Sequence, residues 1–269
     1  MTPLGSLSQP ATRAIAYEAT DASPEGEAPA PDGALDVSRY PQVEIDASDA
    51  SSRPPGPLAE GPPLTGTCNE QSPQDFLVRG NFLKEGPGGN LRAIQYRTEQ
   101  YGYFSGFGRP GPGAKPPTAY VVETTFMGLS VKMHRRVVPA LECVEHEIRR
   151  ACAAHPYTPR ALAGIRTRNT YRGGEVTNHA YGIAIDIDPG QNTCCGCVKP
   201  WNDVPACKRP AKTEYDRMAM PECWVHAFER FGFYWLGHDV LRDTMHFEFL
   251  GDPDRILKTL KTEPSSPAP

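Results

Sequence analysis

The stretch TNHAYGIAID, residues 177–186, places a histidine and an aspartate beside a short apolar run. Its second half is apolar apart from Asp186, which indicates a buried strand. A second stretch, LRDTMHFEF at residues 241–249, carries Asp243 and His246 beside and on another apolar strand. Polar side chains at such positions are costly unless they are paired or bind a metal. The two stretches therefore predict both a sheet and a polar site on it.

The segments around these stretches predict an α+β fold. Strands are expected at residues 120–126, 129–133, 183–187, 233–236 and 245–250, and helices at residues 136–154 and 213–231. The first helix is amphipathic, because its apolar side chains recur every three or four residues. Thr213 caps the second helix, Pro221 splits or kinks it, and Gly232 ends it. For the Gly- and Pro-rich residues 67–119, which contain the run LRAIQYR, we expect one or two short strands and long loops.

The first 66 residues differ in composition from the rest of the 269-residue chain. They contain eleven prolines, ten acidic residues, three basic residues and only two aromatic residues, Tyr17 and Tyr40. So few large apolar side chains cannot offset the entropy that ordering costs, and we expect residues 1–66 to be disordered. Residues 67–260 then form the folded domain, and residues 261–269 form a loose tail.

Charge and hydropathy exclude several classes of protein. The net charge is −4, and because the acidic excess lies in residues 1–66, the remainder is only slightly basic. That is far from the basic footprint of a nucleic-acid binder. No stretch approaches the roughly 18 apolar residues of a membrane helix, and residues 1–20 lack the basic start and apolar middle of a signal peptide.

The eight cysteines favour disulfides and an oxidising compartment, so we expect a periplasmic or secreted protein. Cys143 and Cys152 face opposite sides of one expected helix and cannot pair with each other. A cluster follows later in the chain, consisting of Cys194, Cys195, Cys197, Cys207 and Cys223. It forms either a structural metal knot or two or three disulfides that pin the loop at residues 190–212 near the site and make it one wall of a substrate cleft.

His179, Asp186 and His246 together offer two imidazoles and one carboxylate. Catalytic zinc uses such a set and keeps a fourth position for water, whose pKa it lowers while it polarises a carbonyl. Asp243 lies three residues before His246, a spacing that does not share one strand face. From a turn it would reach the water, take its proton and pass it to the leaving amine. The alternative makes His179 a loop histidine, His246 a core histidine and Asp186 a turn cap.

The segment HAYGIAID is similar to the S-x-H-x-x-G-x-A-x-D signature of the zinc D-alanyl-D-alanine carboxypeptidases and L-alanyl-D-glutamate endopeptidases, the LAS-type metallopeptidases. The segment DTMHF resembles their second signature, in which an acidic residue precedes the third ligand by three. The resemblance implies a small Hedgehog/DD-peptidase-like α+β fold, with a mainly antiparallel sheet flanked by helices. It implies zinc on His179, Asp186 and His246, and Asp243 as the catalytic base.

The family also has a catalytic arginine before the first signature, which Arg166 matches. It would stabilise the oxyanion or hold a substrate carboxylate. Arg168 and Arg172 are rivals for this role, and a solvated basic loop is the alternative. Thr177 stands where the family has Ser. The residue before the third ligand is Asp rather than Glu, which favours the L-alanyl-D-glutamate endopeptidases.

These observations predict a monomeric zinc peptidase that hydrolyses peptidoglycan stem peptides. The rivals are a D-alanyl-D-alanine carboxypeptidase or dipeptidase with the same site, a non-catalytic wall-binding module that keeps the zinc fold, and a cysteine-rich structural protein. Glu248 shares a strand face with His246 and could orient it, whereas His238 and Asp239 either support the site or form an exposed turn. The remaining histidines, expected at the surface or in packing, are His134, His146, His155 and His226.

Overall fold

A computed structural model describes residues 66–169 and 175–258, which all belong to one compact unit. Its helices are η3 (Asp75–Leu77), α1 (Arg79–Phe82), α2 (Pro87–Tyr101), η4 (Pro117–Tyr120), α3 (Val138–Ala151), η5 (Asn178–Tyr181), α4 (Pro205–Lys208), η6 (Glu214–Arg217), α5 (Glu222–Arg230) and η7 (Leu236–His238). Its strands are β1 (Val121–Phe126), β2 (Leu129–His134), β3 (Leu162–Ala163), β4 (Ala184–Ile187), β5 (Phe233–Trp235) and β6 (His246–Phe249). The disorder predicted for residues 1–66 and the loose tail predicted for 261–269 fall, apart from Gly66, outside the described residues.

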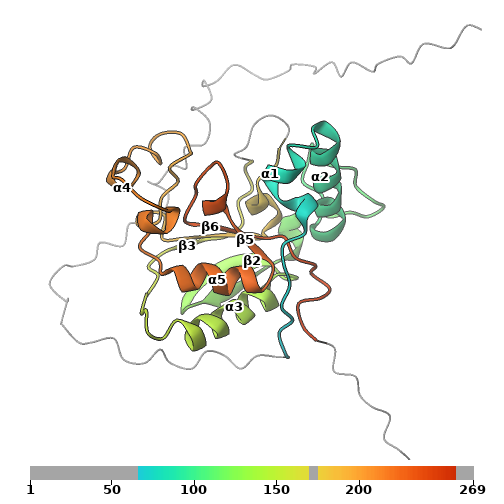
Figure 1. Ribbon diagram of the computed structural model, residues 1–269. Helices are drawn as coiled ribbons and strands as arrows, with labels where there is room; N and C mark the ends of the chain where they lie inside the picture. Colours follow the sequence, from blue (N-terminus) through green and yellow to red (C-terminus); the bar gives the residue numbers. More distant parts are fainter. Residues whose placement is uncertain (1–65, 170–174, 259–269) are drawn as a thin grey trace, which may run out of the picture. The chain divides into compact units, whose positions relative to one another are not determined.

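The central sheet has four antiparallel strands in the order β3-β4-β6-β5, and β1 and β2 form a separate hairpin. Every residue of β4 and β6 is buried, as their apolar sequences predict. Their register places Asp186 opposite His246. Helices α3 and α5 lie side by side along the sheet (Figure 1). The predicted α+β class, with a mainly antiparallel sheet flanked by helices, is confirmed.

The core between these layers is aromatic and is tied by disulfides. Phe228 of α5 stacks on Phe247 of β6, with 4.0 Å between the ring centroids. The Cys152–Cys223 disulfide joins the end of α3 to the start of α5. The prediction that Cys143 does not pair with Cys152 is confirmed, because Cys143 is bonded to Cys68.

The prediction of short strands for residues 67–119 is wrong, whereas residues 102–116 form a long loop as predicted. A fifteen-residue helix, α2, contains the run LRAIQYR and begins with Pro87 at its first position. Residues buried along α2 include Ala93, Ile94, Arg97 and Tyr101, spaced by three and four as on one helix face. The free energy gained by burying that stripe outweighs the β propensity of LRAIQYR and the low helix propensity of the glycines at the helix start.

The predicted helix at 213–231 is divided, as Pro221 indicated. Thr213 and Asp216 form a capping box, but on the short 3-10 helix η6 rather than on a long helix. Pro221 then serves as the N-cap of α5, which begins at Glu222. The left-handed Gly232, with φ of 87°, follows the helix end as predicted.

All eight cysteines are in disulfides, so the predicted disulfides are confirmed and the alternative of a metal knot is wrong. Within the loop, Cys194 pairs with Cys197 and Cys195 pairs with Cys207. Among the residues that the structure describes, no helix combines the length and the hydropathy that crossing a bilayer requires.

Candidate metal centre

Three backbone features bring His179, Asp186 and His246 together. His179 lies on the single turn of η5, and Gly182 then adopts a left-handed conformation with φ of 71° that leads the chain into β4. Asp186 lies on β4 and His246 on β6, directly opposite in the strand register. Residues 60 positions apart are therefore neighbours because two apolar strands pair at the centre of the sheet.

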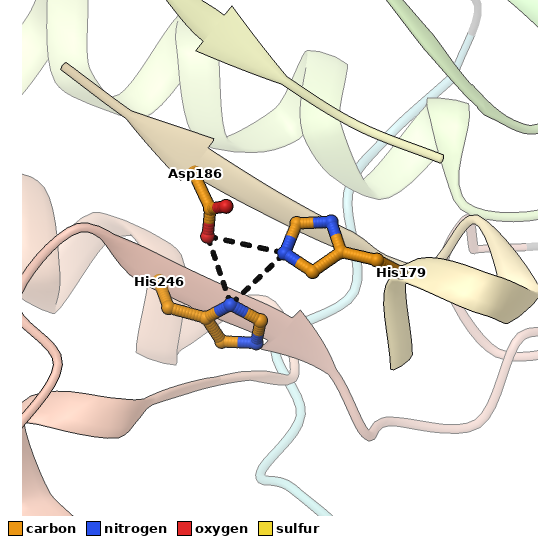
Figure 2. Close-up of side chains that lie close together, drawn as sticks. All are labelled: His179, Asp186 and His246. Carbon is orange, nitrogen blue, oxygen red and sulfur yellow. Dashed lines mark hydrogen bonds and ion pairs between the residues drawn. The ribbon is translucent and has the colours of Figure 1, made fainter. Parts of the chain in front are cut away.

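The three side chains form a tight triangle (Figure 2). Asp186 Oδ1 lies 3.1 Å from His179 Nε2 and 2.9 Å from His246 Nδ1. The two ring nitrogens are 3.1 Å apart. All three residues are at most 3% exposed, so water does not separate or screen these polar atoms. The alternative in which the residues are unrelated loop, core and capping groups does not agree with this geometry.

In each histidine, the ring nitrogen that faces away from the cluster determines whether the nitrogen that faces into it carries a proton. His179 Nδ1 lies 2.6 Å from the Gly164 carbonyl oxygen, and His246 Nε2 lies 3.3 Å from Glu248 Oε2. Both oxygens are acceptors, so each neutral imidazole donates its outer N–H and turns a lone pair inward. When both imidazoles are neutral, two nitrogen lone pairs and Asp186 Oδ1 therefore converge with no N–H or O–H group among them. Three electron-pair donors arranged in this way fit a cation, and a set of two histidines and one carboxylate suits zinc.

The pKa shifts in the metal-free cluster also indicate a demand for positive charge. Burial lowers the pKa of His179 to about 4, so this ring is neutral. Burial opposes a charge on His246, but hydrogen bonds to Asp186 and Glu248 outweigh it and raise the pKa of His246 to about 10. Burial disfavours ionisation of Asp186, yet the two imidazoles hold its pKa well below the usual range. The cluster therefore binds a proton, which supplies the positive charge that a metal ion would otherwise provide.

Asp243 lies in the connection between η7 and β6, which agrees with the turn predicted before the strand of His246. Its backbone N–H donates to the Leu236 carbonyl at 3.0 Å. Its Oδ1 is buried and has no hydrogen-bond partner among the described residues. Burial raises the pKa of Asp243 to about 7, with the charge of His246 lowering it and that of Asp186 raising it. The carboxyl group can thus exchange a proton near neutral pH.

Of the three candidate arginines, Arg166 is the one that contacts the cluster within the described part of the chain. Its backbone N–H donates to the His179 carbonyl at 3.1 Å, and its buried Nε has no partner within the described part of the chain. Its charge acts on the pKa values of both His179 and Asp243. Arg168 is exposed, and Arg172 lies outside the described residues.

One buried pair beside the cluster was only partly predictable. Asn178 Nδ2 donates to Glu248 Oε2 at 2.6 Å, and this oxygen also accepts from His246. Glu248 was a candidate from its strand position, whereas Asn178 had no signal beyond standing before His179. Gly164 contributes a backbone carbonyl, which no residue type can reveal.

The other candidates pair with residues outside the cluster. His238 pairs with Glu229 at 2.8 Å, and Asp239 accepts from Arg79 at 3.4 Å and from the Leu241 N–H at 3.0 Å. As expected of surface or packing residues, His134 is buried among aromatic rings, whereas His146, His155 and His226 are exposed.

An α+β domain that buries two imidazoles and a carboxylate in this way has the donor set of a metal-dependent hydrolase. Residues 171–249 match a family model described as D-alanyl-D-alanine carboxypeptidase, which confirms the predicted resemblance for this segment. The match spans the three cluster residues and Asp243 but not Arg166. No curated protein and no solved structure matches the chain.

Proposed function

We propose that this chain is a zinc-dependent peptidase that hydrolyses the stem peptides of peptidoglycan. The convergence of three buried acceptor atoms, from His179, Asp186 and His246, carries the proposal. The match of residues 171–249 to a carboxypeptidase family supports the substrate class. In this proposal residues 67–260 are the catalytic domain, and the chain acts as a monomer.

His179 Nε2, Asp186 Oδ1 and His246 Nδ1 would hold the zinc ion. Zinc, when bound, supplies Lewis-acid polarisation of the scissile carbonyl and acidifies water. Glu248 fixes the ring of His246 and Gly164 fixes that of His179, so the ligand lone pairs stay directed inward. These hydrogen bonds would orient the metal-ligand atoms before zinc binds.

Asp243 would act first as the general base and then as the general acid. Its Oδ1 has no competing donor among the described residues, so it is free to accept a proton from the attacking water. The same carboxyl group then passes that proton to the leaving amine. A pKa of about 7 suits both steps, because the group can bind and release a proton near neutral pH. The Arg166 guanidinium, whose charge acts on His179 and Asp243, would stabilise the developing oxyanion or hold a substrate carboxylate.

Two bonds in the stem peptide are candidates. Asp243 in place of Glu favours cleavage between L-alanine and D-glutamate, whereas the matching family is described as D-alanyl-D-alanine carboxypeptidase. We place the protein in the periplasm or outside the cell, since four disulfides require an oxidising compartment to persist.

The test is incubation with purified sacculi, with and without a chelator, followed by mass spectrometry of the products. The proposal predicts peptide products that disappear with the chelator and return with added zinc. Release of free D-alanine identifies a carboxypeptidase, and a new D-glutamate amino terminus identifies the endopeptidase. Binding to sacculi without any cleavage would instead identify a wall-binding module.

A further inference from the structure

The Cys194–Cys197 disulfide lies against the carboxylate of Asp243. Both sulfur atoms and a carboxylate oxygen of Asp243 are within 4.8 Å of one another. Because the sulfurs are bonded to each other, they are not available as metal ligands. The disulfide closes a turn at residues 193–197, which we call the cysteine turn, and forms an apolar wall beside Asp243.

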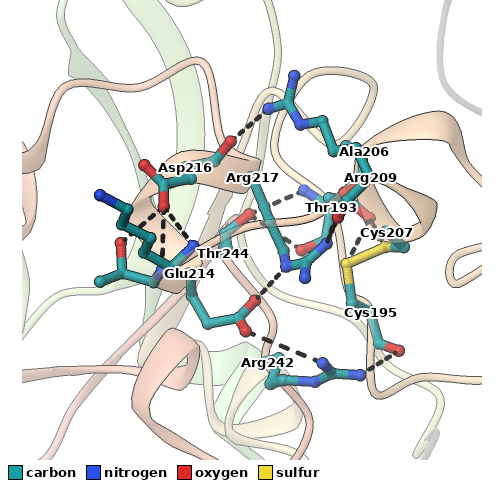
Figure 3. Close-up of polar contacts among 12 residues, drawn as sticks. Thr193, Cys195, Ala206, Cys207, Arg209, Glu214, Asp216, Arg217, Arg242 and Thr244 are labelled. Carbon is teal, nitrogen blue, oxygen red and sulfur yellow. Dashed lines mark hydrogen bonds and ion pairs between the residues drawn. A yellow bond between two sulfur atoms is a disulfide. The ribbon is translucent and has the colours of Figure 1, made fainter.

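The backbone of the cysteine turn pairs with the segment that carries Asp243. Cys194 forms an antiparallel bridge with Asp243. On one side of this bridge, the Thr244 N–H donates to the Thr193 carbonyl at 2.9 Å, and the Thr193 N–H donates to Thr244 Oγ1 at 2.8 Å (Figure 3). On the other side, the Gly196 N–H donates to the Leu241 carbonyl at 2.6 Å. Hydrogen bonds therefore flank Asp243 on both sides.

Two further features hold the turn in place. A Cβ atom on Gly196 would overlap the carbonyl oxygens of Val240 and Leu241, so only glycine allows this close approach. The buried Cys194 packs with Trp201 and Met245 in a small apolar cluster separate from the main core. The turn is thus pressed onto the segment both by its backbone and by its own apolar contacts.

Outside the cysteine turn, hydrogen bonds hold the two ends of this segment: the Leu241 N–H donates to Asp239 Oδ1 at 3.0 Å, and Trp235 Nε1 donates to the Thr244 carbonyl at 3.0 Å. Helix η7 ends at His238 and strand β6 begins at His246, so Asp243 lies between regular elements. Outside the cysteine turn, the hydrogen bond that its own backbone makes is the one to the Leu236 carbonyl. The Asp243 carboxylate also accepts from the Met245 backbone N–H. A shift of the backbone at Asp243 would move the carboxylate relative to the cluster of His179, Asp186 and His246, and misplacement by about 1 Å can cost roughly 100-fold in rate.

We propose that the cysteine turn, closed by the Cys194–Cys197 disulfide, is a positioning element that holds the Asp243 carboxylate beside the cluster of His179, Asp186 and His246. The catalytic consequence rests on the proposed function, whereas the placement of residues 241–244 does not. In this proposal the disulfide acts through the placement of Asp243.

Amide hydrogen exchange of the whole chain tests the placement. Gly196→Ala, and separately Cys194→Ser with Cys197→Ser, should speed exchange of the Thr244 amide by at least about tenfold while α3 keeps its protection. Gly190→Ala is the matched control, because Gly190 lies in the same loop with open space around its Cβ position, and it should change nothing. Unchanged protection of Thr244 in both altered chains would overturn the proposal.

Kinetics on the peptide substrate tests the catalytic consequence. The double serine variant should lose at least about tenfold in kcat, with KM and zinc content unchanged. In an Asp243→Asn background the same change should cost nothing further, because the turn acts through that carboxylate. An equal loss in both backgrounds would overturn the proposal. If the unaltered chain cleaves no peptide, the proposed function fails, and the exchange experiment alone decides the placement.

Discussion

Asp243 is the residue whose replacement should separate catalysis from metal binding. Asp243→Asn keeps the shape of the side chain but removes the proton acceptor, so kcat/KM should fall by about 100-fold or more. Zinc content should stay close to that of the unaltered chain. The control is Asp203→Asn, at an exposed carboxylate that pairs with Lys199 and Lys208. Retention of full activity in Asp243→Asn would remove Asp243 from the mechanism.

The same residue predicts how the metal-free chain responds to pH. The folded pKa of Asp243, about 7, lies above the ordinary value of 3.8, so the folded state binds more protons than the unfolded state between these values. The free energy of unfolding contributed by Asp243 therefore falls as pH rises from about 4 to about 7 and is level above that. Denaturant titrations should show the unaltered chain losing stability relative to Asp243→Asn across this window. A constant difference would contradict the assigned pKa.

Glu248 tests the orientation of the ligands. Glu248→Gln removes the charge that accepts from His246 Nε2 and from Asn178. Loss of such a partner typically weakens metal affinity by about 10- to 100-fold. Competition with a coloured chelator would measure this, with the exposed Glu222→Gln as the matched control. An unchanged zinc Kd in Glu248→Gln would show that His246 is oriented by other contacts.

At the scale of elements, the turn between η5 and β4 determines how His179 meets Asp186. Gly182 has φ of 71°, and a Cβ there would lie 3.1 Å from the backbone nitrogen of His134. Gly182→Ala should lower the free energy of unfolding by more than about 1 kcal/mol and weaken zinc binding. Gly128→Ala is the control, because its φ is 85° but nothing lies within 4 Å. Equal losses in the two variants would mean that the contact with His134 is unimportant.

The elements also show which parts of a fold a sequence reveals. Strands β4 and β6 follow from short apolar runs and helix α3 follows from apolar periodicity, because the residues that these elements bury are apparent in the local sequence. Helix α2 was missed because its start carries Pro87, Gly88 and Gly89, which are typical of loops. Its helical character comes from tertiary burial of Ala93 and Ile94, and a local pattern does not contain that information.

At the scale of the whole molecule, the predictable part of the site is its set of side chains. The two signatures identify His179, Asp186, Asp243 and His246 because these residue types recur at fixed spacings. The supporting contacts depend on how distant segments meet, as when the cysteine turn lies beside Asp243. Disulfide connectivity is likewise a property of the folded chain, and Cys152 with Cys223 joins segments 71 residues apart.

The most direct test of the central claim is a calorimetric titration of zinc into the metal-free chain. The account predicts one tight site per chain in the unaltered protein. It predicts loss of that site in Asp186→Asn, which removes the carboxylate that contacts both imidazoles. The exposed Asp203→Asn should bind zinc as the unaltered chain does. Absence of tight binding in the unaltered chain, or binding that Asp186→Asn leaves unchanged, would contradict a zinc site built on His179, Asp186 and His246.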